Sequence, residues 1–504
     1  MEHEILDILI VGAGLSGIGA AVHLSKRCPG KSFAIVEARE RLGGTWDLFK
    51  YPGIRSDSDM YTLGYNFKPW TARRAIADAP SILTYLHETV DEYGLQDKIL
   101  FNRKVVDASW SSEEALWTVS LQHGDGSLSS VKCNFLHMCS GYYSYDEGHD
   151  PEFPGKADFA GPIVHPQFWP ENLDYSGKKV VVIGSGATAV TLVPSMAATA
   201  AHVTMLQRSP TYIVSRPGED KWALRLRKFL PAKLAYLLTR WKNVLLGLFM
   251  FNLARKKPAA FKGRLLEMVR EEMGPDVNMA DYTPSYNPWD QRLCLVPDSD
   301  LFDSIKSGRA SIVTDHVETF TRGGIKLKSG TMLEADIIVT ATGLKMLTGG
   351  SAAISVDGAP VNFGETVNYK GVMFSGIPNF GMTMGYTNAS WTLKADLTSE
   401  YVCRLINTMD RKGTPIATPT LPVDEPMATE PMLDFSSGYV QRAIAYLPKQ
   451  GDRKPWRLNQ NFPKDIINLR HKAVDDGVIV FSRPGPVAGS RPVERDKPQA
   501  IAAE

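Results

Sequence analysis

Residues 5–17 read Ile-Leu-Asp-Ile-Leu-Ile-Val-Gly-Ala-Gly-Leu-Ser-Gly, and this stretch decides the fold. Its first seven residues, Ile5–Val11, form a short apolar run rich in β-branched side chains, which predicts a buried strand. Glycines follow at once, and Ala20–Leu24 continues with a helical pattern. Ser32–Val36 is expected to form a second strand that leads into Glu37. The stretch therefore begins a βαβ unit.

The glycines have the Gly-x-Gly-x-x-Gly spacing that is typical of dinucleotide-binding units. Gly12 permits a tight turn, Gly14 lets a pyrophosphate approach the backbone, and Gly17 lets the helix pack closely on the strand. The N-terminus of the helix then faces the phosphates. Glu37 lies where an acidic side chain can hold the hydroxyls of an adenosine ribose. We predict a nucleotide site here; the alternative is a tight turn without a ligand.

A second unit of the same kind begins with the strand predicted at Lys179–Ile183. Its fingerprint residues are Gly184, Gly186 and, as the third small residue, Ala189. Its second strand is followed by Arg208 and Ser209, with no acidic residue. A carboxylate there would repel a 2′-phosphate, whereas a guanidinium can hold one by a charge-assisted hydrogen bond. The second unit is therefore predicted to bind NADP, unless Arg208 is only a solvated surface charge.

Two different fingerprints in one chain suggest two nucleotides used together, and a flavin (FAD) reduced by NADPH is the natural pair. The predicted fold class is α/β, with two Rossmann-like dinucleotide-binding domains, one for FAD and one for NADP, and a helical insert in the NADP domain. The expected boundaries are 1–150 and 344–483 for the FAD domain, 151–214 (with the linker) and 289–343 for the NADP domain, 215–288 for the insert, and 484–504 for a mobile tail.

Composition excludes several other classes of protein. The 504 residues carry 56 Lys and Arg against 55 Asp and Glu, a balance that does not favour nucleic-acid binding. The five cysteines form no C-x-x-C pair, which argues against a disulfide framework and against a dithiol redox centre. No histidine array indicates a metal site. The N-terminus has no basic region or cleavage site of a signal peptide, so we expect a cytoplasmic protein.

Two further segments are more specific than the glycine fingerprints. Residues 159–170 fit F-x-G-x-x-x-H-x-x-x-W-[PD] at every fixed position. Residues 43–57 fit [AG]-G-x-W-x4-[FY]-P-[GM]-x3-D. In these segments the chain resembles the type I Baeyer–Villiger monooxygenases, and it looks closest to the subgroup of ethionamide-activating monooxygenases. The likeness runs from the first strand to about Phe462.

The resemblance implies a reaction and a set of residues. In that family a C4a-peroxyflavin, formed from O2, attacks a ketone and gives an ester or lactone. By resemblance Arg292 is the catalytic arginine that stabilises anions, and Asp57 orients it. Many relatives carry a lysine just before this arginine, whereas this chain has Gln291, which weakens the expected preference for NADPH over NADH. Further contacts with the cofactors are expected from Gly44, Thr45, Trp46, Asp57 and Trp391.

Several alternatives remain open at this point. Trp391 either lies close to the nicotinamide or substrate, or has an ordinary packing role. His165 is interpreted as structural or hinge-like, not as a general base. The same cofactor could oxygenate the sulfur of a thioether or thioamide, or a nitrogen, in place of or beside a ketone. An electron-transfer or nucleotide-sensing protein would need both fingerprints, but neither the Asp57–Arg292 pair nor the Trp169-Pro170 ending.

The insert has an unusual composition. Residues 221–264 contain twelve Lys or Arg and no Asp or Glu, interleaved with aliphatic residues. Its longest charge-free stretch, Asn243–Ala254, is shorter than the roughly 20 residues that span a bilayer. The insert could lie on an anionic membrane surface. The favoured alternative is a helical subdomain that packs its apolar face on the protein.

Overall fold

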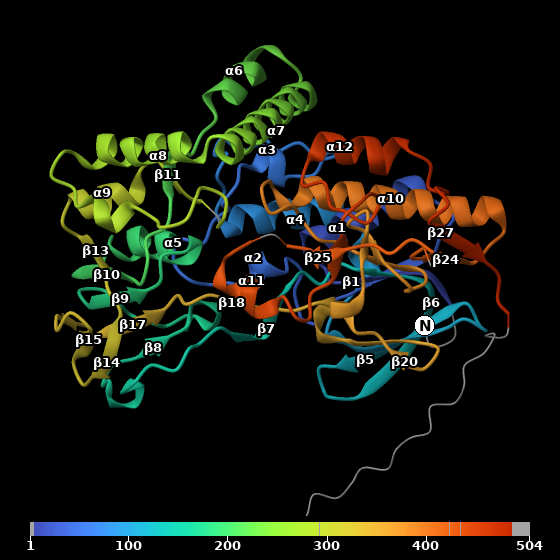
Figure 1. Cartoon of the computed structure of the whole chain (residues 1–504), viewed down its shortest axis with the longest axis horizontal. Helices are drawn as coiled ribbons and strands as arrows, with labels where there is room; N and C mark the ends of the chain where they lie inside the picture. The colour runs from blue at the N-terminus through green and yellow to red at the C-terminus, as the bar shows by residue number, and fades with distance from the viewer. Residues whose placement is uncertain (1–4, 292, 423, 434, 486–504) are drawn as a thin grey trace, which may run out of the picture.

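The computed structural model describes residues 5–291, 293–422, 424–433 and 435–485. Arg292 and most of the tail predicted at 484–504 lie outside these residues. The described chain contains two large sheets that have parallel strands at their centres and helices beside them, as predicted for two Rossmann-like domains (Figure 1).

The first sheet grows from the stretch quoted above. Strand β1 (Leu6–Val11) lies parallel between β2 (Phe33–Val36) and β6 (Leu128–Met138). All four residues of β2 and the last four of β1 are buried, as expected for strands covered on both faces. The sheet order is β20-β19-β4-β5-β6-β1-β2-β3, and β23 also pairs with β6. Helix α1 (Leu15–Arg27) packs against α10 (Trp391–Lys412), so the C-terminal part of the chain returns to the first domain.

Two details differ from the sequence-based expectations. The sequence pattern predicts a helix over Thr398–Met409, whereas helix α10 begins earlier, at Trp391. Its first turns contain Lys394 and Asp396, both of which are buried and paired, so the apolar periodicity is broken where the helix is most deeply embedded. The sequence pattern also predicts a short strand over Phe135–Met138, whereas β6 is longer and begins at Leu128.

The second sheet has the order β13-β10-β9-β17-β8, and all of its pairs are parallel. Strand β9 (Lys179–Ile183) leads through the second fingerprint into α5 (Ala187–Met196). The chain crosses between the domains twice, on β7 (Tyr143–Gly148) and β18 (Leu344–Met346), and these strands pair antiparallel. The two crossings therefore form one ribbon between the sheets.

The insert is helical, as predicted. It consists of α6 (Lys221–Phe229), α7 (Ala232–Lys256) and α8 (Pro258–Met273), and it separates β11 (Ile213–Arg216) from its partner β12 (Cys294–Pro297). Helix α8 packs on the second domain through β11 and α9, whereas α7 packs on α3 of the first domain. Figure 1 shows α6 and α7 (green) standing out at the edge of the molecule. None of the described helices is both long and apolar enough to cross a membrane.

The remaining elements frame these sheets. The other α-helices of the described chain are α2 (Thr45–Leu48), α3 (Met60–Leu63), α4 (Ala79–Glu92), α9 (Asp300–Lys306), α11 (Gly438–Ala443) and α12 (Phe462–Ile466). The other strands are β3 (Ile99–Leu100), β4 (Arg103–Ser111), β5 (Leu116–His123), β8 (Ile163–Val164), β10 (His202–Gln207), β13 (Ala310–Thr314), β14 (Val317–Thr321), β15 (Gly324–Leu327), β16 (Met332–Glu334), β17 (Ile337–Thr340), β19 (Ala353–Val356), β20 (Ala359–Pro360), β21 (Asn368–Tyr369), β22 (Met373–Phe374), β23 (Phe380–Met382), β24 (Ile416–Pro419), β25 (Thr429–Pro431), β26 (Lys449–Gly451) and β27 (Ile479–Ser482).

Candidate functional site

One cavity of about 1740 Å³ lies between the two domains. It is lined by both glycine fingerprints, which follow the carboxyl ends of β1 and β9, and by the crossing ribbon. Ligand pockets for one small molecule typically measure about 300–1,000 Å³. The cavity therefore has room for more than one ligand, and its position outside the carboxyl ends of parallel strands is where α/β sheets bind nucleotides.

The first fingerprint forms a surface without side chains. Gly12 has φ +103°, and a Cβ there would lie 2.7 Å from the carbonyl oxygen of Cys139. Gly14 and Gly44 lie next to each other in the cavity wall, since a Cβ on Gly44 would lie 3.1 Å from the Cα of Gly14. Gly17 does not line the cavity; a Cβ there would lie 1.8 Å from the carbonyl oxygen of Gly12. Gly17 thus allows helix–strand packing, while Gly12, Gly14 and Gly44 leave backbone free for a pyrophosphate.

Glu37 lines the same part of the cavity at the end of β2. Its carboxylate accepts hydrogen bonds from the backbone N–H of Ala13 (2.7 Å) and of Arg39 (3.0 Å). Burial raises the pKa of Glu37, and these two bonds act against that rise. The carboxylate is therefore fixed beside the glycine turn, where it can also accept bonds from ribose hydroxyls. The residues of this half fit an adenine dinucleotide.

The second fingerprint has the same construction. Gly184 has φ +139°, and a Cβ there would lie 2.3 Å from the carbonyl oxygen of Ala341. A Cβ on Gly186 would meet nothing within 4 Å, so its backbone borders open cavity. Ala189 is fully buried in the core of the second domain and does not line the cavity. It serves packing, as Gly17 does in the first unit.

Arg208 and Ser209 follow β10, line the cavity and are exposed to it. Ser209 accepts a hydrogen bond from the Ser185 hydroxyl through its carbonyl oxygen (3.1 Å), which ties this turn to the second fingerprint. Within the described part of the chain no acidic side chain pairs with Arg208. An exposed guanidinium at the end of the second strand is available for a phosphate, because no carboxylate neutralises it.

Two further basic side chains lie at the same edge of the sheet. β10 pairs with β13, and the backbone N–H of Asp315 donates to the Gln207 carbonyl (3.0 Å). The backbone N–H of Lys328 in turn donates to the His316 carbonyl (2.9 Å). His316 and Lys328 therefore lie beside the turn of Arg208, and both line the cavity. The sequence analysis missed them, because they belong to a different strand–turn segment, far from Arg208 along the chain.

The centre of the cavity contains aromatic side chains. The Trp391 ring stacks on Tyr142 with ring centroids 4.9 Å apart and planes at 17°. Its Nε1 donates to the Ser16 hydroxyl at 2.7 Å, and the Tyr143 hydroxyl donates to that of Tyr142 at 2.9 Å. Trp391 lines the cavity and is half-buried. Trp391 thus packs on the first fingerprint helix and forms part of the cavity wall, and its proximity to the nicotinamide or substrate stays a prediction.

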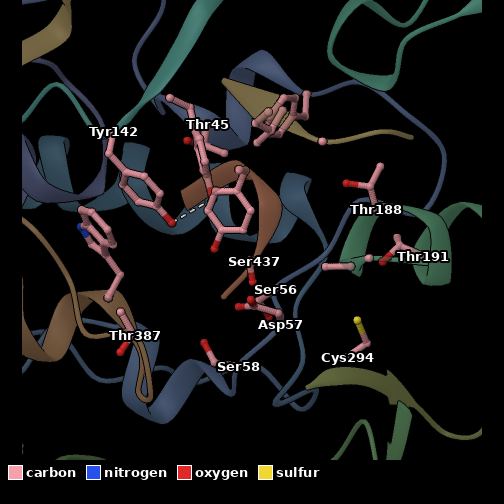
Figure 2. A pocket seen from close by; sticks show the side chains of 18 of the residues that line it. Thr45, Ser56, Asp57, Ser58, Tyr142, Thr188, Thr191, Cys294, Thr387 and Ser437 are labelled. Carbon is pink, nitrogen blue, oxygen red and sulfur yellow. Dashed lines mark hydrogen bonds between the residues drawn. The ribbon is translucent and has the colours of Figure 1, made fainter. Parts of the chain in front are cut away.

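Asp57 lies in the loop between Tyr51 and α3, exposed to the cavity beside Ser56 and Ser58 (Figure 2). Figure 2 shows Thr188, Thr191 and Cys294 of the second domain on the other side of this loop. Because Arg292 lies outside the described residues, the predicted pairing of Asp57 with Arg292 stays a prediction.

The Asp57 loop is held against the second domain. A Cβ on Gly53 would lie 1.8 Å from the Ser195 hydroxyl oxygen of α5. The Tyr51 hydroxyl is hydrogen-bonded to the Thr188 side chain, and burial raises the pKa of Tyr51 to about 12. Both contacts join the first domain to α5. The loop that presents Asp57 is therefore clamped between the two nucleotide-binding units.

Thr45 and Trp46 begin helix α2 and line the cavity beside Gly44. The Tyr145 hydroxyl is hydrogen-bonded to the Thr45 side chain, and burial raises the pKa of Tyr145 to about 12. Tyr145 belongs to the crossing strand β7. Thr45 thus contacts the ribbon that connects the domains, and a Cβ on Gly44 would lie 3.4 Å from the same Tyr145 hydroxyl.

His165 lies on the interdomain connection. Its Nε2 donates to the carbonyl oxygen of Gly343, just before β18, at 3.2 Å, and its ring fills the space where Gly148 of β7 lacks a Cβ. One side chain thereby holds both strands of the crossing ribbon. The described chain contains no cluster of three or more His, Cys, Asp or Glu suited to a metal ion.

Comparisons with known proteins agree with this geometry. Residues 75–347 match the model of flavin-binding monooxygenase-like proteins, and residues 10–70 match that of NAD(P)-binding Rossmann-like domains. The FAD-containing monooxygenase EthA of Mycobacterium tuberculosis is 54% identical over 491 residues, which cover 96% of this chain and 99% of the relative. The probable FAD-binding monooxygenase AlmA of Acinetobacter baylyi is 49% identical over 484 residues, covering 96% and 97%.

Solved structures share the fold. A steroid monooxygenase bound to NADP superposes with a TM-score of 0.70 at 24% identity, covering 83% of this chain and 88% of that one. A complex of OTEMO with FAD and NADP gives 0.68 at 23% identity, covering 82% and 88%. The predicted family and the two-domain fold class are thereby confirmed. With the family match over more than half its length and relatives that align almost end to end, the chain belongs to the flavin-binding monooxygenases and is a FAD-containing monooxygenase.

Proposed function

We propose that this FAD-containing monooxygenase is NADPH-dependent and carries out Baeyer–Villiger oxidation. A ketone, O2, NADPH and a proton give an ester or lactone, water and NADP⁺. The observation that carries the proposal is that both glycine fingerprints line one cavity and that contacts with both domains hold the Asp57 loop between them. The sequence patterns at 43–57 and 159–170 add the resemblance to ketone-oxygenating relatives.

FAD fits the first half of the cavity, and when bound and reduced it activates O2 and supplies the oxygen atom. Gly12, Gly14 and Gly44 leave backbone for its pyrophosphate, and Glu37 is placed for its ribose. Trp391 and Tyr142 form a stacked aromatic wall of the cavity, which can exclude water from the reacting atoms once both cofactors are bound. Exclusion of water strengthens every electrostatic interaction with the reacting atoms.

NADPH is assigned to the second half. Gly184 and Gly186 offer backbone to its pyrophosphate, and the Arg208 guanidinium is free for the 2′-phosphate. Lys328 offers a second cation at the same edge, in place of the lysine that is missing at Gln291. This arrangement favours NADPH over NADH.

Arg292 is proposed to stabilise negative charge that develops on the carbonyl oxygen of the ketone, and Asp57 to orient its guanidinium. Removing a preorganised donor to a developing oxyanion typically costs about 3–4 kcal/mol. Arg292→Ala should therefore lower ester formation by at least about 100-fold. FAD and NADPH should still bind, and NADPH oxidation should release hydrogen peroxide.

The test measures NADPH consumption, peroxide and products over a panel of ketones and thioethers. Arg292→Lys should not restore ester formation, because an ammonium lacks the planar fork of the guanidinium, and Asp57→Ala should show a milder loss. Arg309→Ala, at the amino end of β13 and away from the cavity, is the matched control. Ester formation at the parent rate by Arg292→Ala contradicts the assignment. Turnover of thioethers alone by the wild type would instead identify a sulfur-oxygenating enzyme.

A further inference from the structure

Helices α6 and α7 expose an unusual amount of apolar surface. Of the 15 large hydrophobic side chains exposed in the described chain, eight lie between Trp222 and Phe249. Phe229 is 84% exposed and Phe249 61%. Monomeric soluble proteins rarely expose contiguous apolar patches larger than roughly a few hundred Å², and larger ones mark sites of interaction. The expected packing of an apolar face on the protein is found on the inner side of the insert, through Tyr236 and Val244, and the exposed side chains lie outside that packing.

The exposed residues share one side of each helix. In α7, Leu234, Leu238, Leu245 and Phe249 recur at intervals of four, seven and four residues, which places them on one face. In α6, Phe229 is the most exposed of these side chains and does not line the cavity. We call Phe229 and the four residues of α7 the outer face. The opposite side of α7 is buried through Ala235, Tyr236, Thr239 and Arg240, so the orientation of the helix is fixed.

Cations accompany the outer face. Lys221, Arg225, Lys228, Lys233, Lys256 and Lys257 are all exposed. Within the described chain none of these six has an ion-pair partner, whereas Lys242 pairs with Asp220, and Arg255 with Asp290. Two copies of this face would bring like charges together, which opposes self-association. A negatively charged partner with an apolar interior suits both the charges and the exposed side chains.

We propose that the outer face of α6 and α7 docks on an anionic lipid surface. Aliphatic and aromatic side chains enter the boundary of the acyl chains, and the surrounding Lys and Arg contact the headgroups. Other side chains of the same helices, Trp222 of α6 and Leu246 and Met250 of α7, line the cavity. Docking therefore brings the cavity close to the lipid. The docking itself does not depend on the reaction proposed above.

The experiment is flotation of the FAD-loaded protein with vesicles of phosphatidylcholine, with or without phosphatidylglycerol. Binding is expected to the anionic vesicles at low salt, about 0.02 M, and should weaken at about 0.5 M, where charges are screened. Each cation near the surface contributes about fivefold to binding, so the triple variant Arg225→Gln, Lys228→Gln, Lys233→Gln should bind about 100-fold more weakly. Lys178→Gln, an exposed lysine of the second domain, should bind as the wild type does.

A second pair of variants tests the apolar contribution. Leu245→Ser with Phe249→Ser should weaken vesicle binding by about tenfold or more, since both side chains leave water on docking. Leu128→Ser, at a leucine on β6 that is even more exposed than Leu245 and Phe249, is the control. Neither Leu245 nor Phe249 lines the cavity, so FAD content should not change.

Wild-type protein that stays unbound with anionic vesicles at low salt overturns the proposal, as does unchanged binding of the Leu245→Ser, Phe249→Ser variant. Analytical ultracentrifugation tests the alternative that a second copy of the chain covers the outer face. If the wild type is a dimer that this variant dissociates, and no vesicles bind, the outer face is an interface between copies and the proposal is wrong. Neither flotation nor ultracentrifugation depends on catalytic turnover. Failure of the docking proposal can therefore be told apart from failure of the Baeyer–Villiger proposal.

Discussion

Arg240 anchors the insert to the first domain, and its replacement by methionine tests that anchor. The guanidinium is 4% exposed. It donates to the carbonyl oxygens of Tyr61 (2.9 Å) and Gly64 (2.7 Å), and it lies 3.5 Å from the carboxylate of Asp396. That carboxylate is also 3.0 Å from His23. Arg240→Met keeps an unbranched apolar stem of similar volume but removes every donor.

The magnitude follows from these contacts. Removing one partner of a buried ion pair typically costs about 3–5 kcal/mol, because the other charge stays buried. Asp396 retains His23 and the backbone N–H of Asn66 (3.0 Å), so the lower end, about 3 kcal/mol, applies. The first domain, with the boundaries given above, has 150 and 140 residues in its two parts. At an unfolding entropy of about 2.1 cal/mol/K per residue, each kcal/mol shifts its Tm by about 1.6 °C, so the expected decrease is about 5 °C.

Thermal unfolding of the FAD-loaded protein measures this, with flavin fluorescence for FAD release and circular dichroism for helix content. Arg225→Met is the matched control: the same substitution in the insert, at an exposed arginine without an ion pair in the described chain. Surface substitutions usually change stability by less than about 0.5 kcal/mol. If Arg240→Met unfolds at the same temperature as the control, Arg240 does not anchor the insert, and the reasoning from its buried hydrogen bonds is refuted.

Two further predictions concern the nucleotide sites. Gly14→Asp should yield colourless or insoluble protein, because a carboxylate would meet the pyrophosphate; Gly30→Asp, where a Cβ meets nothing within 4 Å, should remain yellow. Recovery of yellow Gly14→Asp at full FAD occupancy would contradict the first site. Arg208→Ala should raise the KM for NADPH about 10- to 150-fold, the value of a hydrogen bond to a charged group, and leave NADH nearly unaffected. Steady-state kinetics with both coenzymes check this, and equal effects on both would mean that Arg208 does not contact the 2′-phosphate.

The parts of the site that the sequence predicted are local in the chain. Gly12, Gly14 and Gly44 line the cavity because a turn between a strand and a helix is specified by neighbouring residues. The contacts that complete the site are not local. Lys328 reaches the turn of Arg208 only through the pairing of β10 with β13 and the turn that follows. The bond between Tyr51 and Thr188 joins two domains. No periodicity or spacing reports such contacts.

The insert shows a different limit of sequence-based prediction. Helix α7 carries aliphatic residues on all sides, so its amphipathic pattern is weak and does not tell which side turns inward. In the structure, the side of α7 that carries Arg240 faces the first domain. The guanidinium donates to three backbone carbonyl oxygens there. A leucine side chain in its place would leave these buried carbonyls without a donor. The polar residue, and not the apolar ones, therefore determines the orientation of the helix.

This orientation gives the two sides of α7 independent roles. The buried side holds the helix against α3 and places Asn243 and Leu246 along the cavity, so changes there should alter stability and FAD retention together. The outer face makes no comparable contact, so Leu245 and Phe249 stay exposed without an evident benefit to the fold. Exposed apolar side chains that do not stabilise a protein are a liability in water. A lipid surface that covers these side chains accounts for their exposure beside cations that have no ion pair in the described chain. Substitutions on this side of α7 should therefore change vesicle binding, whereas substitutions on the buried side should change the unfolding temperature.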